Sequence, residues 1–300
     1  DAAVAVGFAL AVTLPRAGNL GGGGFMLVYI ASENRVVALD YREKAPLVAS
    51  PNMYLNGDGS VDTQRSKFHI WSTGVPGTVF GLVTAWEKYG SLPLQVIVDP
   101  AIRLAEEGID VSYDLAVSLQ RVKSRLSQES QSVFLKSDGT FYNVGDRLVQ
   151  PDLAWSLKQI ARDGKNSFYT GEIAEKIVEF MQKNGGLITT ADLARYASVW
   201  RLPVTGNYHG DTIYAMPPPS SGGVHLIQML NVLESFPLHN MGHNSAQYSY
   251  YLAETMKVAY ADRSQYLGDP DFVTVPVAKL TSKAYGNQIA QTISKNLVRP

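Results

Sequence analysis

Residues 36–46 read V-V-A-L-D-Y-R-E-K-A-P, an apolar segment that leads directly into a cluster of charges. The valines and the leucine favour a β-strand, and Pro46 ends it because its ring cannot join a ladder of backbone hydrogen bonds. Side chains alternate between the two faces of a strand, so Asp40 and Arg42 are expected on one face and Tyr41 on the other. The segment therefore predicts a strand that ends in charged residues.

Arg42 is the candidate ligand-binding residue at this strand end. A strand holds such a side chain rigidly, and the planar guanidinium donates two parallel hydrogen bonds to a carboxylate. A purely structural role is the alternative, in which Arg42 pairs with Asp40 or Glu43 at the edge of the sheet. The local sequence by itself favours the structural role. Motifs elsewhere in the chain are needed to choose between ligand binding and an ion pair.

The chain begins with an apolar helical pattern. Residues 1–14 are apolar nearly all round, which predicts a helix buried between layers. Asp1 suits the first turn, where the helix dipole favours an acid, and Pro15 and Gly18 end the helix.

A glycine run and a hairpin connect this helix to the charged strand end. Residues 25–30 and 35–41 predict two strands joined around Glu33 and Asn34. The glycines at residues 21–24 offer backbone N–H groups to an anion, but no Gly-Lys-Ser/Thr sequence follows them. A close approach of two backbones is therefore expected there rather than a phosphate site.

Helical and strand-like periods alternate along the rest of the chain. Helices are predicted at residues 77–89, 93–107, 113–126, 151–163, 172–183, 223–233, 246–266 and 277–293. A short helix to Tyr196 is expected, with Thr190, Ala191 and Asp192 as its cap. Short strands are predicted at residues 199–203, 204–208 and 212–215, and loops at residues 47–72 and 127–145. Strands near both ends with helices between them favour one layered α/β or α+β unit.

Composition excludes several classes of function. The chain has 300 residues, 45% hydrophobic residues and a net charge of -1, which is ordinary for a globular protein and argues against a nucleic-acid surface. The absence of cysteine excludes thiol catalysis, disulfides and cysteine metal sites. No apolar stretch is long enough to span a bilayer. The chain opens without a Met or a signal peptide, so we expect a fragment of a longer protein.

Several residues have the spacing of a chemical site without its context. His239 and His243 are four residues apart, but the Asn-Met-Gly between them predicts a loop, so no metal site is expected. His225 lies among apolar residues and is expected to be a hydrogen-bonded core histidine, and Asp269 and Asp271 are expected in a turn that ends a helix. No Ser lies in a Gly-x-Ser-x-Gly elbow, and we assign no catalytic nucleophile to this chain.

Seven motifs, in order over essentially the whole chain, resemble the large subunit of the γ-glutamyltranspeptidases, most closely the bacterial type. They are D-A-A-V-A-V-G-F-A-L at 1–10, G-N-L-G-G-G-G-F-M at 18–26, D-Y-R-E-K-A-P at 40–46, G-V-P-G-T-V at 74–79, K-N-G-G-L-I-T at 183–189, M-P-P-P-S-S-G-G at 216–223 and A-Y-A-D-R-S-Q-Y-L-G-D-P-D-F at 259–272. The resemblance implies that residues 1–300 are the large-subunit portion of one γ-glutamyltranspeptidase unit, and we assign no independent subdomain boundary within it.

The resemblance also implies a fold and a reaction. Such proteins are made as precursors of the N-terminal nucleophile hydrolase class, with a four-layer αββα sandwich of the α+β class that a separate small subunit completes. The precursor cuts itself before a Thr, which begins the small subunit and attacks the γ-amide of glutathione or a related γ-glutamyl compound, with its own α-amine as base. Water, an amino acid or a dipeptide then accepts the γ-glutamyl group. No cofactor, nucleic acid or membrane span is implied, and the expected location is periplasmic or secreted.

Arg42 matches the arginine of the family's D-[FY]-R-E motif. The resemblance implies that it binds the α-carboxylate of the γ-glutamyl group, with Asp40 or Glu43 orienting it. This reverses the preference for a structural role.

Two further hypotheses about the function stay open: a related acylase that acts on glutaryl-cephalosporins, and a non-catalytic homologue that binds carboxylates or supports a partner. The segment at residues 217–223 is expected to pack near the active-site region.

Overall fold

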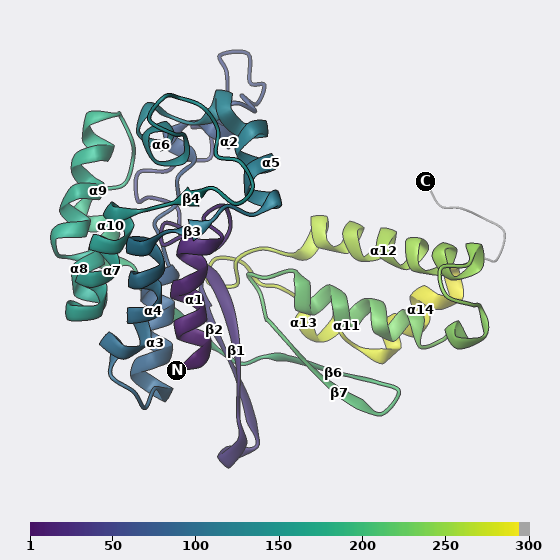
Figure 1. Ribbon diagram of the computed structural model, residues 1–300. Helices are drawn as coiled ribbons and strands as arrows, with labels where there is room; N and C mark the ends of the chain where they lie inside the picture. The colour runs from purple at the N-terminus through teal and green to yellow at the C-terminus, as the bar shows by residue number, and fades with distance from the viewer. Residues whose placement is uncertain (294–300) are drawn as a thin grey trace. The chain divides into compact units, whose positions relative to one another are not determined.

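A computed structural model describes residues 1–293 of the chain, which divides into two compact units (Figure 1). The first unit contains residues 1–24 and 41–199, and the second contains residues 25–40 and the chain from residue 200 onward. The predicted unit of residues 1–300 includes residues 294–300, which lie outside the described residues.

The first unit is mainly helical. Its helices are α1 (Ala2–Thr13), α2 (Arg65–Phe68), α3 (Thr78–Tyr89), α4 (Leu94–Glu107), α5 (Tyr113–Val122), α6 (Gln128–Phe134), α7 (Pro151–Asp163), α8 (Lys165–Tyr169), α9 (Glu172–Lys183) and α10 (Thr190–Arg195), with the 3₁₀ turns η2 (Ile70–Ser72) and η3 (Lys123–Arg125). The two short strands β3 (Ile109–Asp110) and β4 (Arg147–Leu148) pair antiparallel.

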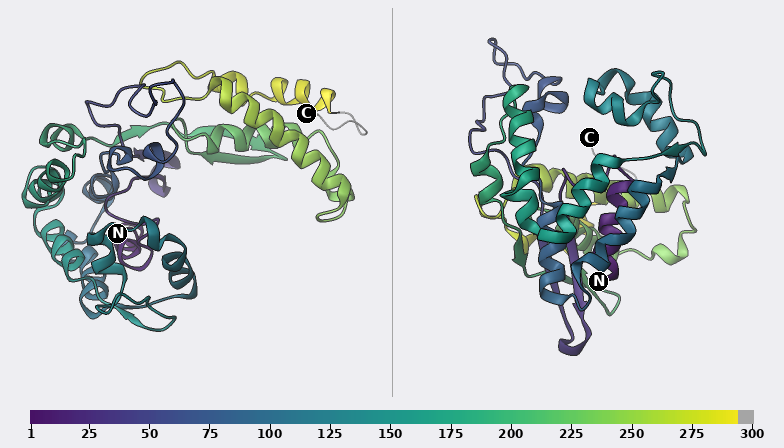
Figure 2. Two further views of the ribbon diagram at one scale, coloured as in Figure 1. Left: turned by 90° about the horizontal axis from the view of Figure 1, so that it is seen from above. Right: turned by 60° about the vertical axis from the view of Figure 1, so that its left-hand side comes forward.

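The core of the first unit forms where α4 packs against both α1 and α7. Figure 2 shows the purple α1 beside the blue α4. Phe8 and Val12 of α1, Val98 of α4, and Leu157 and Ile160 of α7 have no exposed surface. Burying an aliphatic or aromatic side chain of this size contributes about 1.5–3 kcal/mol. The apolar stripes of these helices therefore hold the unit together.

Helix α1 confirms the predicted N-terminal helix but not every detail of it. Val6 and Leu10 are 56% and 39% exposed, so the helix is not covered on all sides by the described residues. Asp1 makes no side-chain cap of α1, and its carboxylate instead accepts a hydrogen bond from the Ser91 hydroxyl at 2.5 Å. The acid therefore ties the helix start to a distant loop.

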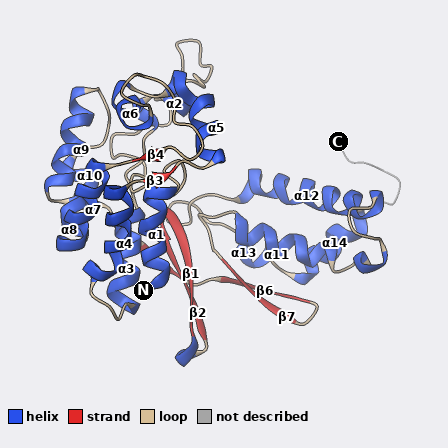
Figure 3. Cartoon of the chain, viewed as in Figure 1, coloured by secondary structure: helices blue, strands red, loops and turns tan. Residues whose placement is uncertain are grey.

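The second unit combines strands and helices (Figure 3). Its three-stranded sheet has β2 (Arg35–Tyr41) between β1 (Gly24–Ile30) and β5 (Val199–Arg201), and a second hairpin pairs β6 (Val204–Tyr208) antiparallel with β7 (Asp211–Ala215). The helices are α11 (Gly222–Leu233), α12 (Ala246–Tyr266), α13 (Val277–Leu280) and α14 (Lys283–Thr292), with the turns η1 (Ala31–Glu33) and η4 (Leu238–Asn240). Helix α11 contacts both α12 and α14.

The core of the second unit contains two buried clusters. One joins the β6–β7 hairpin to the helices through Val204, Val224, Ile227 and Leu280, all less than 9% exposed. Gly206 of β6 is required there, because a Cβ atom at this position would lie 2.6 Å from Ile227 Cγ2. The other cluster, Val232, Leu233, Tyr251, Ile289, Ala290 and Ile293, joins α11, α12 and α14.

Local patterns predicted most elements, and the errors are short helices inside predicted loops, one predicted helix that is two, and one helix cap. The hairpin is confirmed, with Asn34 in the left-handed conformation at φ 46°, which asparagine tolerates better than most residues. Ser127 caps α6 inside the predicted loop at 127–145, and α2 lies inside the predicted loop at 47–72. The predicted last helix is wrong as a single element, because Ser282 caps a separate α14. Thr189, rather than Thr190, caps α10.

Candidate functional site

Strand β2 ends at Tyr41, and Arg42 is the first residue beyond it, with an exposed side chain. Residues 37–40 are all buried, so burial does not alternate along this strand and the predicted division of its residues between two faces stays a prediction. A strand covered on both faces shows no alternation of burial. The exposed residues begin only after Tyr41, so β2 delivers Arg42 from a buried and rigid element.

Two glycine segments of the first unit enclose the backbone at this strand end. A Cβ atom at Gly23 would lie 2.6 Å from the Tyr41 carbonyl oxygen, and a Cβ atom at Gly77 would lie 1.9 Å from the same oxygen. The Tyr41 ring fills the space beside Gly24 and Gly81, and burial raises the pKa of its hydroxyl. The predicted close approach of backbones at residues 21–24 is confirmed.

Backbone hydrogen bonds join three of the sequence motifs in the first unit. Lys44 and Val75 exchange two bonds, with N–O distances of 3.2 and 2.7 Å. The N–H groups of Gly77 and Thr78 both donate to the carbonyl of Gly22, at 2.7 and 3.0 Å. The glycine loop, the D-Y-R-E segment and the G-V-P-G-T segment therefore form one tightly fitted backbone structure around Arg42.

A tyrosine from a distant part of the first unit contacts Arg42 itself. The Tyr196 hydroxyl donates to the Arg42 carbonyl at 2.9 Å, and its ring stacks on Tyr169 with the centroids 5.5 Å apart. The Tyr169 hydroxyl donates to the Pro76 carbonyl at 2.8 Å and accepts from the Phe80 N–H at 3.2 Å. Burial raises the pKa of Tyr169, so it stays neutral.

Asp40, two residues before Arg42, takes part in an ion-pair cluster of the second unit. The Arg201 Nε donates to Asp40 at 2.9 Å, and its two Nη atoms donate to the Asp271 carboxylate at 3.0 and 2.9 Å. The side chains of Arg201 and Asp40 are 14% and 8% exposed, whereas that of Asp271 is 46% exposed. The carboxylates of Asp271 and Asp40 raise the pKa of the Arg201 guanidinium.

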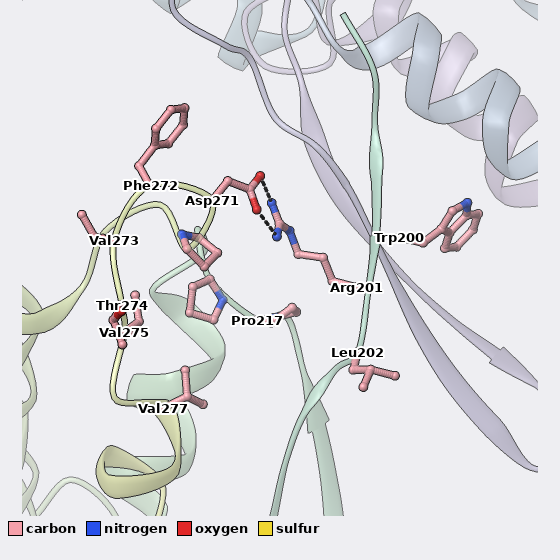
Figure 4. Close-up of a pocket in the computed structure, with 12 residues that line it drawn as sticks. Trp200, Arg201, Leu202, Pro217, Asp271, Phe272, Val273, Thr274, Val275 and Val277 are labelled. Carbon is pink, nitrogen blue, oxygen red and sulfur yellow. Dashed lines mark hydrogen bonds and ion pairs between the residues drawn. The ribbon is translucent and has the colours of Figure 1, made fainter.

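An open pocket of about 730 Å³ lies beside this cluster in the second unit. Arg201 and Asp271 face one another there, and Leu202, Pro217 and Phe272 add apolar surface (Figure 4). Pro217 belongs to the segment at 217–223 that was expected near the active-site region, an expectation that the pocket does not test.

The gamma-glutamyltranspeptidase family matches the chain over residues 1–300. The chain belongs to this family. A glutathione hydrolase proenzyme of Escherichia coli (strain K12) is 50% identical over 303 residues, which cover 100% of this chain and 52% of that protein. The chain thus spans about half the length of the curated relatives it matches. An Acylase ACY 1 proenzyme of Pseudomonas sp. (strain SE83) is 38% identical, over 96% of this chain and 53% of that protein.

Solved structures of the family share the fold. The crystal structure of Helicobacter pylori gamma-glutamyltranspeptidase matches with a TM-score of 0.97 at 48% identity, over 99% of this chain and 86% of that chain. A gamma-glutamyltranspeptidase from Pseudomonas nitroreducens, complexed with L-DON, matches with a TM-score of 0.93. The predicted fold, the α+β class of the N-terminal nucleophile hydrolases with its four-layer αββα sandwich, is confirmed by these matches.

The histidines and aspartates whose spacing resembles that of a chemical site lie in loops, a turn and the core. His239 lies in η4 and His243 in the loop after it, and residues 1–293 contain no group of three or more His, Cys, Asp or Glu placed to hold a metal. The Nδ1 atom of His225 lies 3.2 Å from Gln228 Oε1, as expected for a core histidine. Asp269 accepts from the Asp271 N–H in the turn after α12, which confirms the expected turn.

Sequence reasoning missed the two residues that hold this strand end. Arg201 has no local motif that marks it, although Asp271 was noted as an acid in a turn. Tyr196 was noted only as the end of a short helix, 154 residues from Arg42. The suggested orienting role of Asp40 toward Arg42 stays a prediction, and the Asp40 carboxylate has Arg201 as one partner.

Proposed function

We propose that this chain is the large-subunit portion of an enzyme that cleaves the γ-glutamyl amide bond of glutathione and related compounds. The enzyme passes the γ-glutamyl group to water, an amino acid or a dipeptide. The 50% identity to a glutathione hydrolase proenzyme supports this function over that of the acylases, for which the identity is 38%. The family fold, with a TM-score of 0.97, supports it as well.

The observation that carries the proposal is the presentation of Arg42. Its side chain is exposed at the end of a buried strand, while its backbone is held by Tyr196 and by the tight glycine contacts around Tyr41. A guanidinium held in this way is preorganised to donate two hydrogen bonds to the α-carboxylate of a γ-glutamyl group. Preorganisation lowers the cost of binding, because little side-chain and backbone freedom is then lost.

The reaction needs a partner that carries the nucleophile. In this proposal the hydroxyl of an N-terminal Thr on a small subunit attacks the γ-carbonyl carbon, and its proton passes through the Thr α-amine to the leaving amine. The resulting γ-glutamyl ester is then attacked by water or by the amine of an acceptor, which regenerates the Thr hydroxyl. The role of Arg42 is to hold the other end of the donor, so that the amide carbonyl lies at the nucleophile.

The partner and the location are parts of the same proposal. The relatives are proenzymes about twice the length of this chain, which supports a small subunit made from the same precursor. We assign no cofactor, metal or nucleic acid to the reaction. No helix within residues 1–293 is long and apolar enough to cross a membrane. A periplasmic or secreted location is proposed from the family resemblance.

The test compares two chromogenic donors with the full-length, matured protein. Turnover of γ-glutamyl p-nitroanilide well above that of glutaryl p-nitroanilide, with release of glutamate, is the expected result. A preference for the glutaryl donor would assign the protein to the acylases instead. Turnover of neither donor by a correctly cleaved protein would favour the non-catalytic homologue. Residues 1–300 expressed alone should be inactive, and activity in that fragment would contradict the need for a second subunit.

A further inference from the structure

We propose that Tyr196 is a positioning residue for Arg42, and that its hydroxyl sets the direction in which the Arg42 side chain approaches the donor carboxylate. The inference rests on the proposed function of Arg42 and adds a residue from a distant part of the first unit to the recognition of the donor. It follows from one hydrogen bond, from the rigidity of the ring that makes it, and from the lack of space around the strand end.

The hydrogen bond acts directly on the peptide of the candidate ligand residue. The Tyr196 Oη donates to the Arg42 carbonyl oxygen at 2.9 Å, and Tyr196 is only 4% exposed. Arg42 lies one residue beyond the last residue of β2, where the regular ladder of the strand has ended. A side-chain donor placed at that peptide therefore fixes an orientation that the sheet itself no longer dictates.

The ring of Tyr196 is held on several sides. It stacks on Tyr169 with an interplanar angle of 15°, and the edge of Phe80 meets it at a centroid distance of 5.5 Å. The Lys44 ammonium lies 5.4 Å from the centre of the Tyr196 ring. Tyr169 is itself fixed, through its hydrogen bonds with Pro76 and Phe80. The donor atom of Tyr196 therefore has little freedom to follow a movement of Arg42.

Close packing restricts the strand end to one arrangement. A Cβ atom at Gly77 would lie 2.1 Å from the Tyr196 hydroxyl and 1.9 Å from the Tyr41 carbonyl oxygen. The hydroxyl and the strand end thus both lie against the same glycine, with no space for a side chain between them. A close-packed region of this kind passes a local change on to its neighbours.

Loss of the hydroxyl should therefore be felt in donor recognition. Without this hydrogen bond the Arg42 peptide is held less firmly, and a rotation of the peptide turns the attached Arg42 side chain. Displacing a positioned group by about 1 Å can cost up to about 100-fold in rate. The attack of the nucleophile on the amide should change little, because in the proposed function the nucleophile belongs to another subunit and does not contact the α-carboxylate.

The test uses two donors that differ by one group. γ-Glutamyl p-nitroanilide carries the α-carboxylate, and 4-aminobutanoyl p-nitroanilide is the same molecule without it. Acylation by the full-length, matured enzyme is followed by p-nitroaniline release, under single-turnover conditions for the slower donor. Tyr196→Phe should lower kcat/KM about tenfold with the γ-glutamyl donor, mainly through KM, and less than about twofold with the 4-aminobutanoyl donor.

Tyr169→Phe is the matched control. It removes the same atom from the neighbouring, stacked ring, but the lost hydroxyl binds the Pro76 carbonyl instead of the Arg42 carbonyl. It should lower thermal stability at least as much as Tyr196→Phe does, because the Phe80 N–H also loses its partner. Because this variant keeps the hydrogen bond from Tyr196 to Arg42 and acts on it only through the stacked ring, it should change kcat/KM for the two donors to within about twofold of each other. A merely structural role for Tyr196 predicts the same behaviour for both variants.

The outcomes separate this inference from the function on which it rests. If Arg42→Ala lowers kcat/KM equally for both donors, the proposed function of Arg42 fails. If Arg42→Ala is selective for the γ-glutamyl donor but Tyr196→Phe is not, the positioning role fails alone. The double variant should be no worse than Arg42→Ala, since a positioning residue has no effect once the residue it positions is gone. Failure of Tyr196→Phe to mature while Tyr169→Phe matures would also overturn the inference, because the hydroxyl would then be an element of folding.

Discussion

The residues before and after Tyr41 are held by different physical means. Before it, the buried carboxylate of Asp40 binds Arg201, whose guanidinium also holds Asp271. After it, the backbone of Arg42 is held by the neutral hydroxyl of Tyr196 and by close glycine contacts. A charged partner holds the buried side chain of Asp40, and a neutral donor holds the backbone carbonyl of Arg42.

The difference explains how the two arginines are expected to act. Arg201 donates to two carboxylates and is mostly buried, so its hydrogen-bonding capacity is largely committed to structure. Arg42 is exposed, and Tyr196 binds its backbone carbonyl rather than its guanidinium. A neutral hydroxyl therefore orients the peptide without adding a charge beside the guanidinium. Removing Arg201 should therefore cost stability, and removing Arg42 should cost activity.

Arg201→Ala should have the largest effect. It removes the Arg201 guanidinium from the buried Asp40 carboxylate, and breaking a buried ion pair in this way should lower the free energy of unfolding by about 3–5 kcal/mol. Denaturant-induced unfolding of the matured protein measures this. The double variant Arg201→Ala with Asp40→Asn should recover part of the loss, because the buried charge is gone. Asp271→Asn should cost less than about 1 kcal/mol, since Asp271 is half exposed. A stable Arg201→Ala protein would contradict the structural role.

Arg42→Ala should act on catalysis. Removing one member of a desolvated charge pair costs about 2–5 kcal/mol, which corresponds to a decrease of roughly 30- to 4000-fold in kcat/KM for a γ-glutamyl anilide. Arg42→Lys should also be damaging, because an ammonium group keeps the charge without the planar pair of donors.

In the proposed function, self-cleavage of the precursor needs no α-carboxylate, so both Arg42 variants should still mature into two subunits, as a denaturing gel would show. A matured Arg42→Ala enzyme with a nearly normal kcat/KM would return Arg42 to the structural role, and the contrast with Arg201 would disappear.

Gly77→Ala tests the close packing that holds the backbone around Arg42. The new methyl group would lie 1.9 Å from the Tyr41 carbonyl oxygen and 2.1 Å from the Tyr196 hydroxyl, so the backbone has to move. Overpacking of this kind costs about 1–3 kcal/mol, visible as a lower thermal midpoint together with a higher KM for the donor. Gly57→Ala is the control, since no atom lies within 4 Å of its added Cβ. Equal behaviour of the two variants would show that the strand end tolerates movement.

Asp192 is a buried acid of the first unit, in the capping box of α10, and its effect should be the smallest. Burial raises the pKa of this carboxyl, but hydrogen bonds from the Thr189 hydroxyl and N–H and from the Leu47 N–H outweigh burial and lower it overall. A lowered pKa means that the stabilisation is complete above the unfolded-state value near 4 and is lost as the pH falls below it.

Asp192→Asn should therefore lower the free energy of unfolding by about 1 kcal/mol at pH 7 and by less at pH 3. Thermal melts of both proteins across this pH range measure the difference. A difference that grows as the pH falls would show that the sign of the linkage is wrong.

The sequence alone determined those features that depend on neighbours along the chain. The 3.6-residue period located α9 at residues 172–183 and α12 at residues 246–266, and the apolar runs around Asn34 located the β1–β2 hairpin. Helix and strand periods are local properties, as are the preferences of Gly and Pro at their ends. The motif around Arg42 similarly identified the candidate ligand residue and, through its resemblance to a family, the fold.

Only the tertiary structure decided which residues hold that arginine in place. Tyr196 reaches the Arg42 carbonyl from 154 residues away, and Arg201 reaches Asp40 from 161 residues away. No local pattern marks either residue, because a tyrosine after a helix and an arginine in a short strand are common. They have these roles because the folded chain brings the Tyr196 hydroxyl to Arg42 and the Arg201 guanidinium to Asp40, the two residues next to Tyr41. Such distant contacts depend on how the whole chain closes, which a short window of sequence does not contain.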